Sequence, residues 1–218
     1  YISYLENGKW TRPKNMGAPM NTPGWESQPS LSADGSTLYF ASDRLGGYGL
    51  KDIWFSERSP DGVWSTPKNI GAPVNTLKND GSPFIHPDNE TLYFMSDGLP
   101  GMGGTDIYLS RRQEDGSWGT PVNLGYPINT SGNEGALVVS PAGDIAYYTA
   151  IKDGGKRSKE GFDDTDIYYF QLDSAIRPKP VSFFKARMLD AMAGKPVRGL
   201  VQVTDIRTDS LYYKGLAA

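Results

Sequence analysis

A 54-residue repeat constrains the fold of this 218-residue chain more than any other feature. Three tryptophans stand 54 residues apart, and each opens a phrase of the form W-x-x-P-x-N-x-G-x-P-x-N-T: Trp10, Trp64 and Trp118. An acidic residue, an aromatic run and an Asp-Ile-aromatic run then recur in the same order. A fixed period of this length is the signature of an array of like structural units.

Each unit holds four short β-prone runs separated by turns. Asp34-Gly35 joins the first two runs and Asp61-Gly62 joins the last two, because glycine supplies the positive φ of such hairpins. Two hairpins in series form a four-stranded propeller blade. The sequence thus predicts an all-β fold with about three blades, and half a blade more in Tyr1–Trp10. Since known rings use about four to eight blades, we expect five or more in the intact ring.

The repeat resembles the TolB-type propeller repeat often called PD40. In that repeat S-P-D-G, an aromatic strand, a Ser-Asp element, a glycine-rich loop and an Asp-Ile-aromatic run follow one another. Residues 27–56 and 82–110 match this order well, and residues 134–170 match less well because Ala150-Ile151 replaces Ser-Asp. The resemblance implies a propeller but no particular function, because propellers host unrelated activities.

The repeat stops after Asp173. We expect blades over residues 1–173, a proline-bearing linker over 174–180 and a second domain over 181–218. Gly194-Lys195-Pro196-Val197 and Val201-Gln202-Val203 resemble the opening of a carboxypeptidase regulatory-like domain. That resemblance implies the start of a transthyretin-like β-sandwich.

A PD40-type propeller followed by such a sandwich resembles the middle of the OmpA-family envelope lipoproteins of Bacteroidetes, which include PorE-like components of type IX secretion. The resemblance implies a non-enzymatic scaffold in the periplasm, associated with the outer membrane. It also implies envelope proteins as partners, and peptidoglycan as the ligand of a domain outside this chain. The alternative is a propeller that binds carbohydrate or peptidoglycan fragments.

Composition and motifs narrow the function classes. Lys+Arg (22) nearly balance Asp+Glu (25), so we expect no nucleic-acid partner. The chain has no cysteine, and no run approaches the roughly 18 apolar residues of a transmembrane helix. His86 is the only histidine, and no catalytic motif surrounds it. We therefore expect neither catalysis nor a cofactor.

Antiparallel strands place two kinds of loop on one rim of the propeller: those between the second and third strands of a blade, and those between blades. The acidic residues of this rim could bind a cation, a basic peptide or a partner protein, or their carboxylates could cap loop N–H groups. Recurrence in every blade favours the structural role. The same argument assigns Trp10, Trp64 and Trp118 to blade packing. The acidic rim residues are Glu26, Asp80, Glu134, Asp43, Asp97, Asp52, Asp106 and Asp166.

Residues that break the repeat are the better candidates for binding. Trp25 stands where the other copies have asparagine, and Arg44 and Tyr48 belong to a glycine-rich rim loop. Asp166 follows Asp106 by 60 residues instead of 54, so the loop before it carries an insertion. That loop contributes three basic candidates, Lys156, Arg157 and Lys159. Asp163, Asp164 and Asp166 form a calcium candidate, although a turn also explains this cluster.

Overall fold

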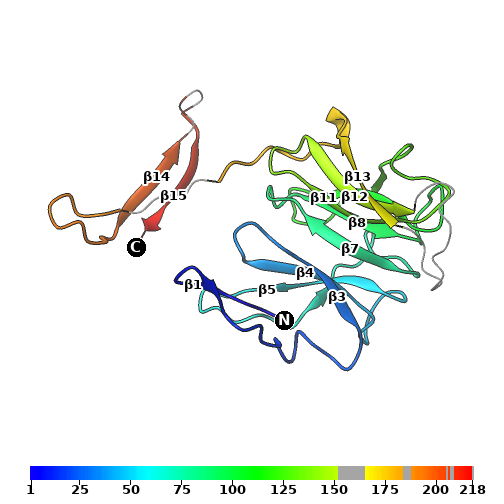
Figure 1. Cartoon of the computed structure of the whole chain (residues 1–218), viewed down its shortest axis with the longest axis horizontal. Helices are drawn as coiled ribbons and strands as arrows, with labels where there is room; N and C mark the ends of the chain where they lie inside the picture. Colours follow the sequence, from blue (N-terminus) through cyan, green and yellow to red (C-terminus); the bar gives the residue numbers. More distant parts are fainter. Residues whose placement is uncertain (152–164, 184–187, 205, 207–208, 218) are drawn as a thin grey trace. The chain divides into compact units, whose positions relative to one another are not determined.

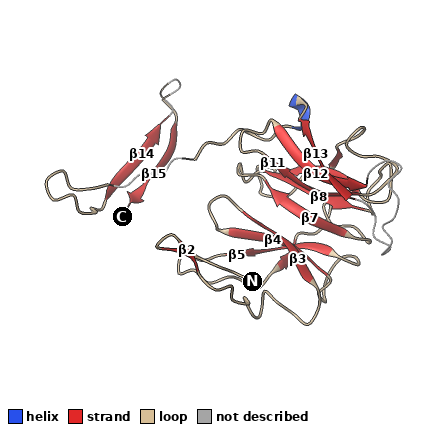
Figure 2. Cartoon of the chain, in the orientation of Figure 1, coloured by secondary structure: helices blue, strands red, loops and turns tan. Residues whose placement is uncertain are grey.

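The computed structural model describes residues 1–151, 165–183, 188–204, 206 and 209–217. The chain divides into two units, Tyr1–Val181 and Ser182–Ala218. The first unit is a series of antiparallel sheets (Figure 1), joined by the loops drawn in tan in Figure 2. The sheets follow the repeat and do not close into a ring, so the predicted all-β partial propeller is confirmed.

Two complete four-stranded blades occupy the middle of the first unit. The first blade comprises β3 (Glu26–Leu31), β4 (Thr37–Ser42), β5 (Asp52–Glu57) and β6 (Lys68–Asn69). The second blade comprises β7 (Asp80–Ile85), β8 (Thr91–Ser96), β9 (Asp106–Arg111) and β10 (Val122–Asn123). In both blades each strand pairs with the next one along the chain.

Incomplete blades flank these two. The hairpin of β1 (Leu5–Glu6) and β2 (Lys9–Trp10) precedes the first blade. The third blade comprises β11 (Glu134–Val139), β12 (Ile145–Ile151) and β13 (Thr165–Gln171). Within the described residues the third sheet has three strands, because the chain turns into the short 3₁₀ helix η1 (Ser174–Ile176) instead of forming a fourth.

The side chains of successive residues in a strand point to opposite faces of the sheet. Each blade can therefore pack against one neighbouring blade on each face. Tyr39 of β4 packs toward the second blade, whereas the next residue, Phe40, packs on the other face of the same sheet with Met20 and Trp54. The predicted hairpin turns are present, with Gly35 at φ 72° and Gly62 at φ 84°. Local turns therefore set the register, and alternation gives each blade two apolar faces.

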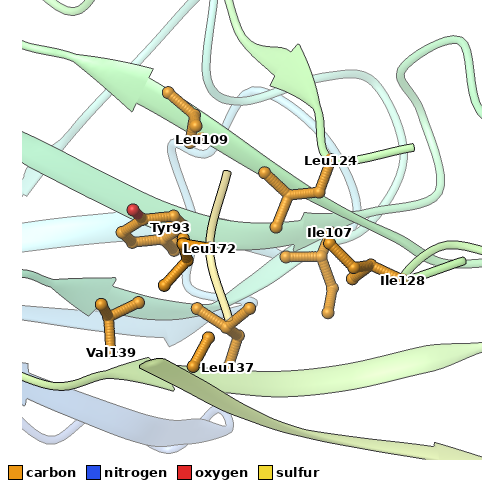
Figure 3. Close-up of a cluster of buried hydrophobic side chains, with 9 residues drawn as sticks. Tyr93, Ile107, Leu109, Leu124, Ile128, Leu137, Val139 and Leu172 are labelled. Atoms are coloured by element: carbon orange, nitrogen blue, oxygen red, sulfur yellow. The ribbon is translucent and has the colours of Figure 1, made fainter. Parts of the chain in front are cut away.

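The hydrophobic core lies between blades. The core between the second and third blades joins Tyr93, Ile107 and Leu109 to residues of the third blade, as Figure 3 shows. Leu124 and Ile128, from the loop that connects the two blades, complete it. The equivalent core between the first and second blades contains Tyr39, Ile53 and Val74 opposite Leu92 and Phe94 of the next blade. Blades are thus stabilised by burying each face against a neighbour.

The repeated tryptophans differ in their surroundings. The Trp118 ring meets the Tyr39 ring of the preceding blade edge-on, with centroids 6.3 Å apart. Trp64 packs against the Met20–Phe40–Trp54 cluster. Trp10 is exposed. Packing between blades therefore accounts for Trp118.

The segment after the third blade is held against the propeller by hydrogen bonds. The Tyr93 hydroxyl donates to the Ile176 carbonyl at 2.8 Å, and the Arg111 guanidinium donates to the Arg177 carbonyl at 2.8 Å. The Lys179 N–H donates to Asp88, and the Val181 N–H to the Pro141 carbonyl. The proline-bearing stretch is therefore fastened to the second and third blades.

Among its described residues, the second unit contains a hairpin of β14 (Gly199–Thr204) paired with β15 (Leu211–Ala217). Leu189 and Pro196 form a β-bridge across the turn that contains Gly194. This two-stranded sheet exposes Leu200, Tyr213 and other apolar side chains. A transthyretin-like sandwich stays a prediction for this region.

Ile107 and Val63 offer a direct test of where stability resides. Ile107 is buried between blades, and Val63 is exposed on a turn. We expect Ile107→Ala to lower the free energy of unfolding by about 2–5 kcal/mol, because it leaves a cavity in the core. Val63→Ala should change it by less than about 0.5 kcal/mol. Urea unfolding followed by tryptophan fluorescence measures both, and equal effects would contradict a core that lies between blades.

Candidate binding rim

One rim of the propeller consists of two sets of loops, which we call the loop rim. The first set links the second and third strands of each blade, over residues 43–51 and 97–105. The second set links consecutive blades, over residues 70–79 and 124–133, with residues 11–25 preceding the first blade. The turn at Asp61-Gly62 joins β5 to β6 and lies on the opposite rim.

Adjacent loops of the rim touch through glycine. The Leu50 N–H donates to the Lys78 carbonyl at 2.8 Å, and the Gly104 N–H donates to the Gly132 carbonyl at 2.8 Å. A side-chain carbon at Gly49 would overlap the Thr76 and Lys78 carbonyl oxygens. Glycine is therefore required here because the two backbones approach closely.

Recurrent carboxylates cap the N–H groups of these loops. Asp52 is buried, accepts from the backbone N–H groups of Tyr48 and Gly49, and accepts from the Asn69 amide at 3.1 Å. Asp106 accepts from Met102 and Gly103 in the same way. These carboxylates replace water as hydrogen-bond partners of a tight loop, which is a structural role.

The Asn-Thr pair that ends each repeated phrase fastens the loop between blades to a strand. Asn75 accepts from the Ile53 N–H and donates to the Ile53 carbonyl, both at 2.9 Å, and Asn129 does the same with Ile107 at 2.8 Å. The Thr76 hydroxyl donates to Asp80 at 2.9 Å. Burial raises the pKa of Asp80 despite these donors, and nearby Asp52 adds to the increase.

Arg44 is part of the fold of the first blade. Its side chain is only 8% exposed and pairs with Glu26 at 3.4 Å. It donates to the Met20 carbonyl at 2.7 Å, and its guanidinium stacks on the Phe40 and Trp54 rings at 4.8 and 5.3 Å from their centroids. The structure therefore corrects the prediction that Arg44 is available for binding, because a buried, fully engaged guanidinium cannot reach a partner.

Trp25 and Tyr48 lie at the surface of the loop rim. The Trp25 ring carries the Lys51 ammonium group 4.5 Å above its centroid. Trp25 and Lys51 line a cleft of about 290 Å³ between the first two blades, with Gln28, Asn79 and Asp97. Cation–π contact holds Lys51 over the indole ring. The cleft therefore combines one aromatic surface with several polar groups.

The loop rim also exposes large apolar side chains that our sequence reasoning did not single out. Leu45 and Leu50 flank Tyr48 in one loop, and Met102 stands in the equivalent loop of the second blade. Leu77 and Tyr126 project from the loops between blades. Leu45 is 99% exposed and Tyr126 79% exposed. The sequence signal that could have identified them is the presence of apolar residues in glycine-rich loops, because such surface loops are otherwise polar.

Several predicted site residues fall outside this rim or outside the described chain. Lys156, Arg157, Lys159, Asp163 and Asp164 lie outside the described residues. Asp166 is exposed, unlike its buried equivalents Asp52 and Asp106. Among described residues, no group of three His, Asp or Glu side chains is placed to hold a metal ion. No helix in that part of the chain is long and apolar enough to cross a bilayer.

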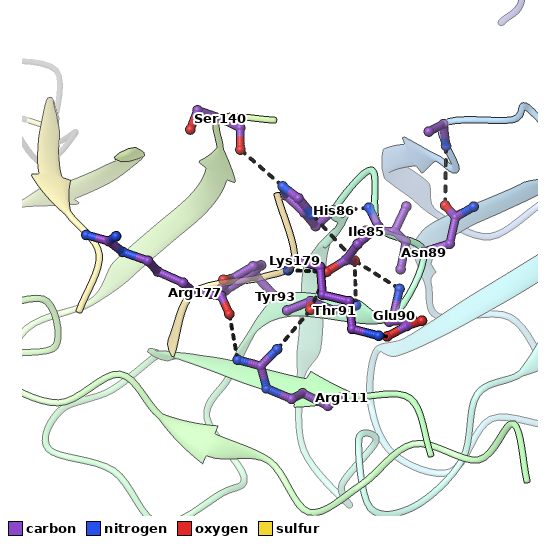
Figure 4. A network of polar contacts seen from close by, with 12 residues as sticks. Ile85, His86, Asn89, Glu90, Thr91, Tyr93, Arg111, Ser140, Arg177 and Lys179 are labelled. Carbon is purple, nitrogen blue, oxygen red and sulfur yellow. Dashed lines mark hydrogen bonds and ion pairs between the residues drawn. The ribbon is translucent and has the colours of Figure 1, made fainter. Parts of the chain in front are cut away.

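His86 belongs to a buried polar network on the side of the propeller that holds residues 174–181, as Figure 4 shows. Its Nε2 lies 3.0 Å from the Ser140 carbonyl, and its Nδ1 accepts from the Asp88 N–H at 3.2 Å. Both ring nitrogens are therefore engaged: Nε2 joins the second blade to the third, and Nδ1 fastens the turn that follows β7. A fully buried, fully bonded imidazole serves packing, and substrate cannot reach it.

Solved structures of two known proteins align with most of this chain. No protein-family model matches the chain, and no curated protein matches it in sequence. A crystal structure of TolB from Acinetobacter baumannii aligns with a TM-score of 0.45 and 15% identity, over 82% of this chain and 38% of TolB. A puromycin hydrolase structure aligns at 0.34 and 14%, over 86% of this chain and 32% of that one. The chain thus spans well under half the length of either.

Asp52→Ala tests the capping role of the rim carboxylates. Because two backbone N–H groups and the Asn69 amide lose their acceptor, we expect a loss of about 1–3 kcal/mol in the free energy of unfolding. Hydrogen exchange at Tyr48 and Gly49 should accelerate. The exposed Glu114→Ala is the control and should leave both measurements unchanged. Unaltered exchange in Asp52→Ala would show that the carboxylate does not cap the loop.

Asp88 should make stability depend on pH in the acid range. Burial acts to raise its pKa, but the close contact with His86 and the hydrogen bonds from Glu90 and Thr91 outweigh this and hold the pKa at about 2. The folded state therefore favours the carboxylate, which contributes stability above about pH 4 and loses it as pH falls toward 2. Asp88→Asn should lower stability at pH 7 and flatten its dependence between pH 4 and 2, in urea titrations at fixed pH. The matched Glu114→Gln should keep the wild-type profile.

Proposed function

We propose that this chain is a non-enzymatic protein-interaction module whose loop rim docks partner proteins. The observation that carries the proposal is the exposure of Leu45, Tyr48, Leu50, Met102 and Tyr126 on loops of one rim. Large apolar side chains exposed on a rigid scaffold favour binding to a protein partner, because binding removes their surfaces from water. Rim loops are fastened to the blades by buried Asn and Asp side chains, so these tips are presented in a fixed arrangement.

The proposal places the partner among envelope proteins. The PD40-type repeat and the Gly194-Lys195-Pro196-Val197 element resemble those of periplasmic, outer-membrane-associated scaffolds, including PorE-like components of type IX secretion. In such an arrangement a peptidoglycan-binding domain outside this chain anchors the protein. The loop rim would then remain available for a partner, because the anchor lies elsewhere in the polypeptide.

A carbohydrate or peptidoglycan fragment is the second candidate ligand. The cleft lined by Trp25, Lys51, Asn79 and Asp97 favours it, because sugars bind to an aromatic face flanked by hydrogen-bonding side chains. Lys51 already covers the Trp25 ring, however, so a sugar would have to displace it. For this reason we place protein docking first.

A double substitution separates the two candidates. We expect Leu45→Ser/Tyr48→Ser to reduce capture of solubilised outer-membrane proteins by about tenfold or more, since removing central apolar contacts costs above ~1.4 kcal/mol. Quantitative mass spectrometry of proteins retained by the immobilised chain measures the loss. Val63→Ser, on the opposite rim, is the control and should retain wild-type capture.

The same samples are applied to an array of glycans and peptidoglycan fragments. Binding there that disappears in Trp25→Ala but survives in Leu45→Ser/Tyr48→Ser would refute protein docking and favour the carbohydrate candidate. Envelope-protein capture that is identical in the wild type and the double variant would also refute protein docking through the loop rim.

A further inference from the structure

The first blade pairs a buried carboxylate with an internal cation. The Arg44 guanidinium lies 3.4 Å from the Glu26 carboxylate and donates to the Ser42 hydroxyl at 3.1 Å. It also donates to two backbone carbonyls, that of Pro19 at 3.3 Å and that of Met20 at 2.7 Å. A carboxylate, a hydroxyl and two carbonyl groups therefore surround a positive charge at this position of the blade.

The second blade repeats the oxygen-bearing groups of this position 54 residues later. Asp80 and Ser96 correspond to the residues with the carboxylate and the hydroxyl, and Pro73 and Val74 to those with the two carbonyls. The turns that carry these carbonyls are alike, since each is closed by a bond from the N–H of the following asparagine to a glycine carbonyl, at 2.8 and 2.9 Å. The second blade thus presents a similar set of oxygen atoms.

The arginine itself is not repeated. Gly98 stands at its position, and a side-chain carbon there would overlap the Thr76 side chain, 2.0 Å from its hydroxyl oxygen. The loop of the second blade therefore has no room for a basic side chain at this point. In the third blade the sequence has Lys152 here, although this residue lies outside the described part of the chain. Both flanking repeats thus carry a basic residue where the second blade carries glycine.

Asp80 keeps one oxygen atom without a hydrogen-bond partner. Its Oδ2 accepts from the N–H and the hydroxyl of Thr76, whereas its Oδ1 is buried and, among the described residues, unpartnered. The Oδ1 of Asp106 is in the same state, and both residues are 1% exposed. Buried carboxylate oxygens are costly without a donor or a cation, so these two atoms indicate a ligand.

Asp80, Ser96 and Asp106 form one row across the sheet. Asp80 pairs with Ser96 and Ser96 pairs with Asp106, and directly paired residues project from the same face. Burial raises the pKa of Asp80, and the nearby Ser96 hydroxyl opposes this increase. Burial also raises the pKa of Tyr108, with further increases from the Asp106 and Asp80 carboxylates. Both carboxylates therefore lie close enough to one hydroxyl to act on it electrostatically.

The oxygen atoms of this row select the kind of cation. They belong to carboxylate, hydroxyl and carbonyl groups, and hard cations such as Ca²⁺ prefer such ligands. No basic side chain of the described residues forms an ion pair with Asp80 or Asp106, so a divalent ion can balance both carboxylates. Mg²⁺ fits less well, because it demands octahedral geometry and loses its water molecules reluctantly.

We propose that the second blade binds Ca²⁺ between Asp80, Ser96 and Asp106, at the position that the Arg44 guanidinium holds in the first blade. The two Oδ1 atoms supply the charged ligands, and the Ser96 hydroxyl supplies a neutral one. The carbonyls of residues 73 and 74 complete the set, as the equivalent carbonyls do for the arginine. The site uses only two acidic side chains, so it does not require a group of three, which the described residues do not provide.

The proposal goes beyond the proposed function, because it concerns the interior of one blade and needs no partner protein. The ion joins the first residues of β7 and β9 to the segment that links the first two blades. It should therefore stabilise the second blade beneath the loop rim. The two proposals can fail separately, since docking is measured by protein capture and this one by ion binding.

Ca²⁺ itself is the probe, titrated into the whole chain after a chelator has removed bound metal. Isothermal titration calorimetry should show about one Ca²⁺ per chain, with half-saturation on the order of 10⁻⁴–10⁻³ M, as in extracellular calcium modules. The thermal unfolding midpoint should rise with Ca²⁺ concentration, because the ion binds the folded state. Asp80→Asn should weaken binding by about tenfold or more, since loss of even an outer-shell partner of a metal ligand costs that much.

Two further variants complete the test. Ser96→Ala removes the neutral ligand and should also weaken binding, so the result does not depend on Asp80→Asn alone. Asp97→Asn is the matched control, because Asp97 is a carboxylate of the same blade whose two oxygens both accept from Asn79. It should retain the wild-type affinity. Circular dichroism should show an unchanged fold in all three variants.

Three results would overturn the proposal. A wild-type chain that binds no Ca²⁺ at millimolar concentration would show that the row takes no metal. Equal affinity in Asp80→Asn and the wild type would place the ion elsewhere, and its loss in Asp163→Asn/Asp164→Asn would assign it to the loop before β13. A loss in Asp97→Asn as large as that in Asp80→Asn would show a response to overall charge and not to this row.

Discussion

Burial of one blade face against the next is the interaction on which the rest of this structure depends. A four-stranded sheet with apolar side chains on both faces cannot be stable alone in water, because each face holds several aromatic and branched residues. Tyr93, Ile107 and Leu109 illustrate the solution, since they are nearly inaccessible once the third blade covers them. Stability is therefore shared between neighbours, as in other repeat proteins.

Polar side chains complete this arrangement where loops cross from blade to blade. Asn75 and Asn129 bind both backbone groups of a buried isoleucine, and Asp52 and Asp106 bind the N–H groups of glycine-rich loops. These residues recur because every blade faces the same problem of satisfying buried backbone groups. The side chains left for recognition are those at the loop tips, such as Leu45 and Tyr126, which contribute little to the blade itself.

Local patterns made much of the fold predictable. The hairpins at Asp34-Gly35 and Asp61-Gly62 depend on a few adjacent residues, and the 54-residue period multiplies them into blades. The buried state of Arg44 was not predictable, because it depends on Phe40, Trp54 and the Met20 carbonyl meeting around the guanidinium. The fastening of residues 174–181 was also missed, since its donors Tyr93 and Arg111 lie more than sixty residues earlier in the chain. Trp25 was identified correctly as a surface aromatic, but its partner Lys51 was not.

The fastening of residues 174–181 also has a mechanical consequence. A force applied to the chain beyond Val181 acts first on the hydrogen bonds that join this segment to Pro141, Asp88, Arg111 and Tyr93. These bonds join the segment to the second and third blades, so the load is shared by several contacts in parallel before it reaches β13. Without them, the same tension would peel β13 from its sheet one hydrogen bond at a time. Residues 174–181 therefore distribute a force applied beyond Val181 over the second and third blades, which protects β13 from being separated from its sheet.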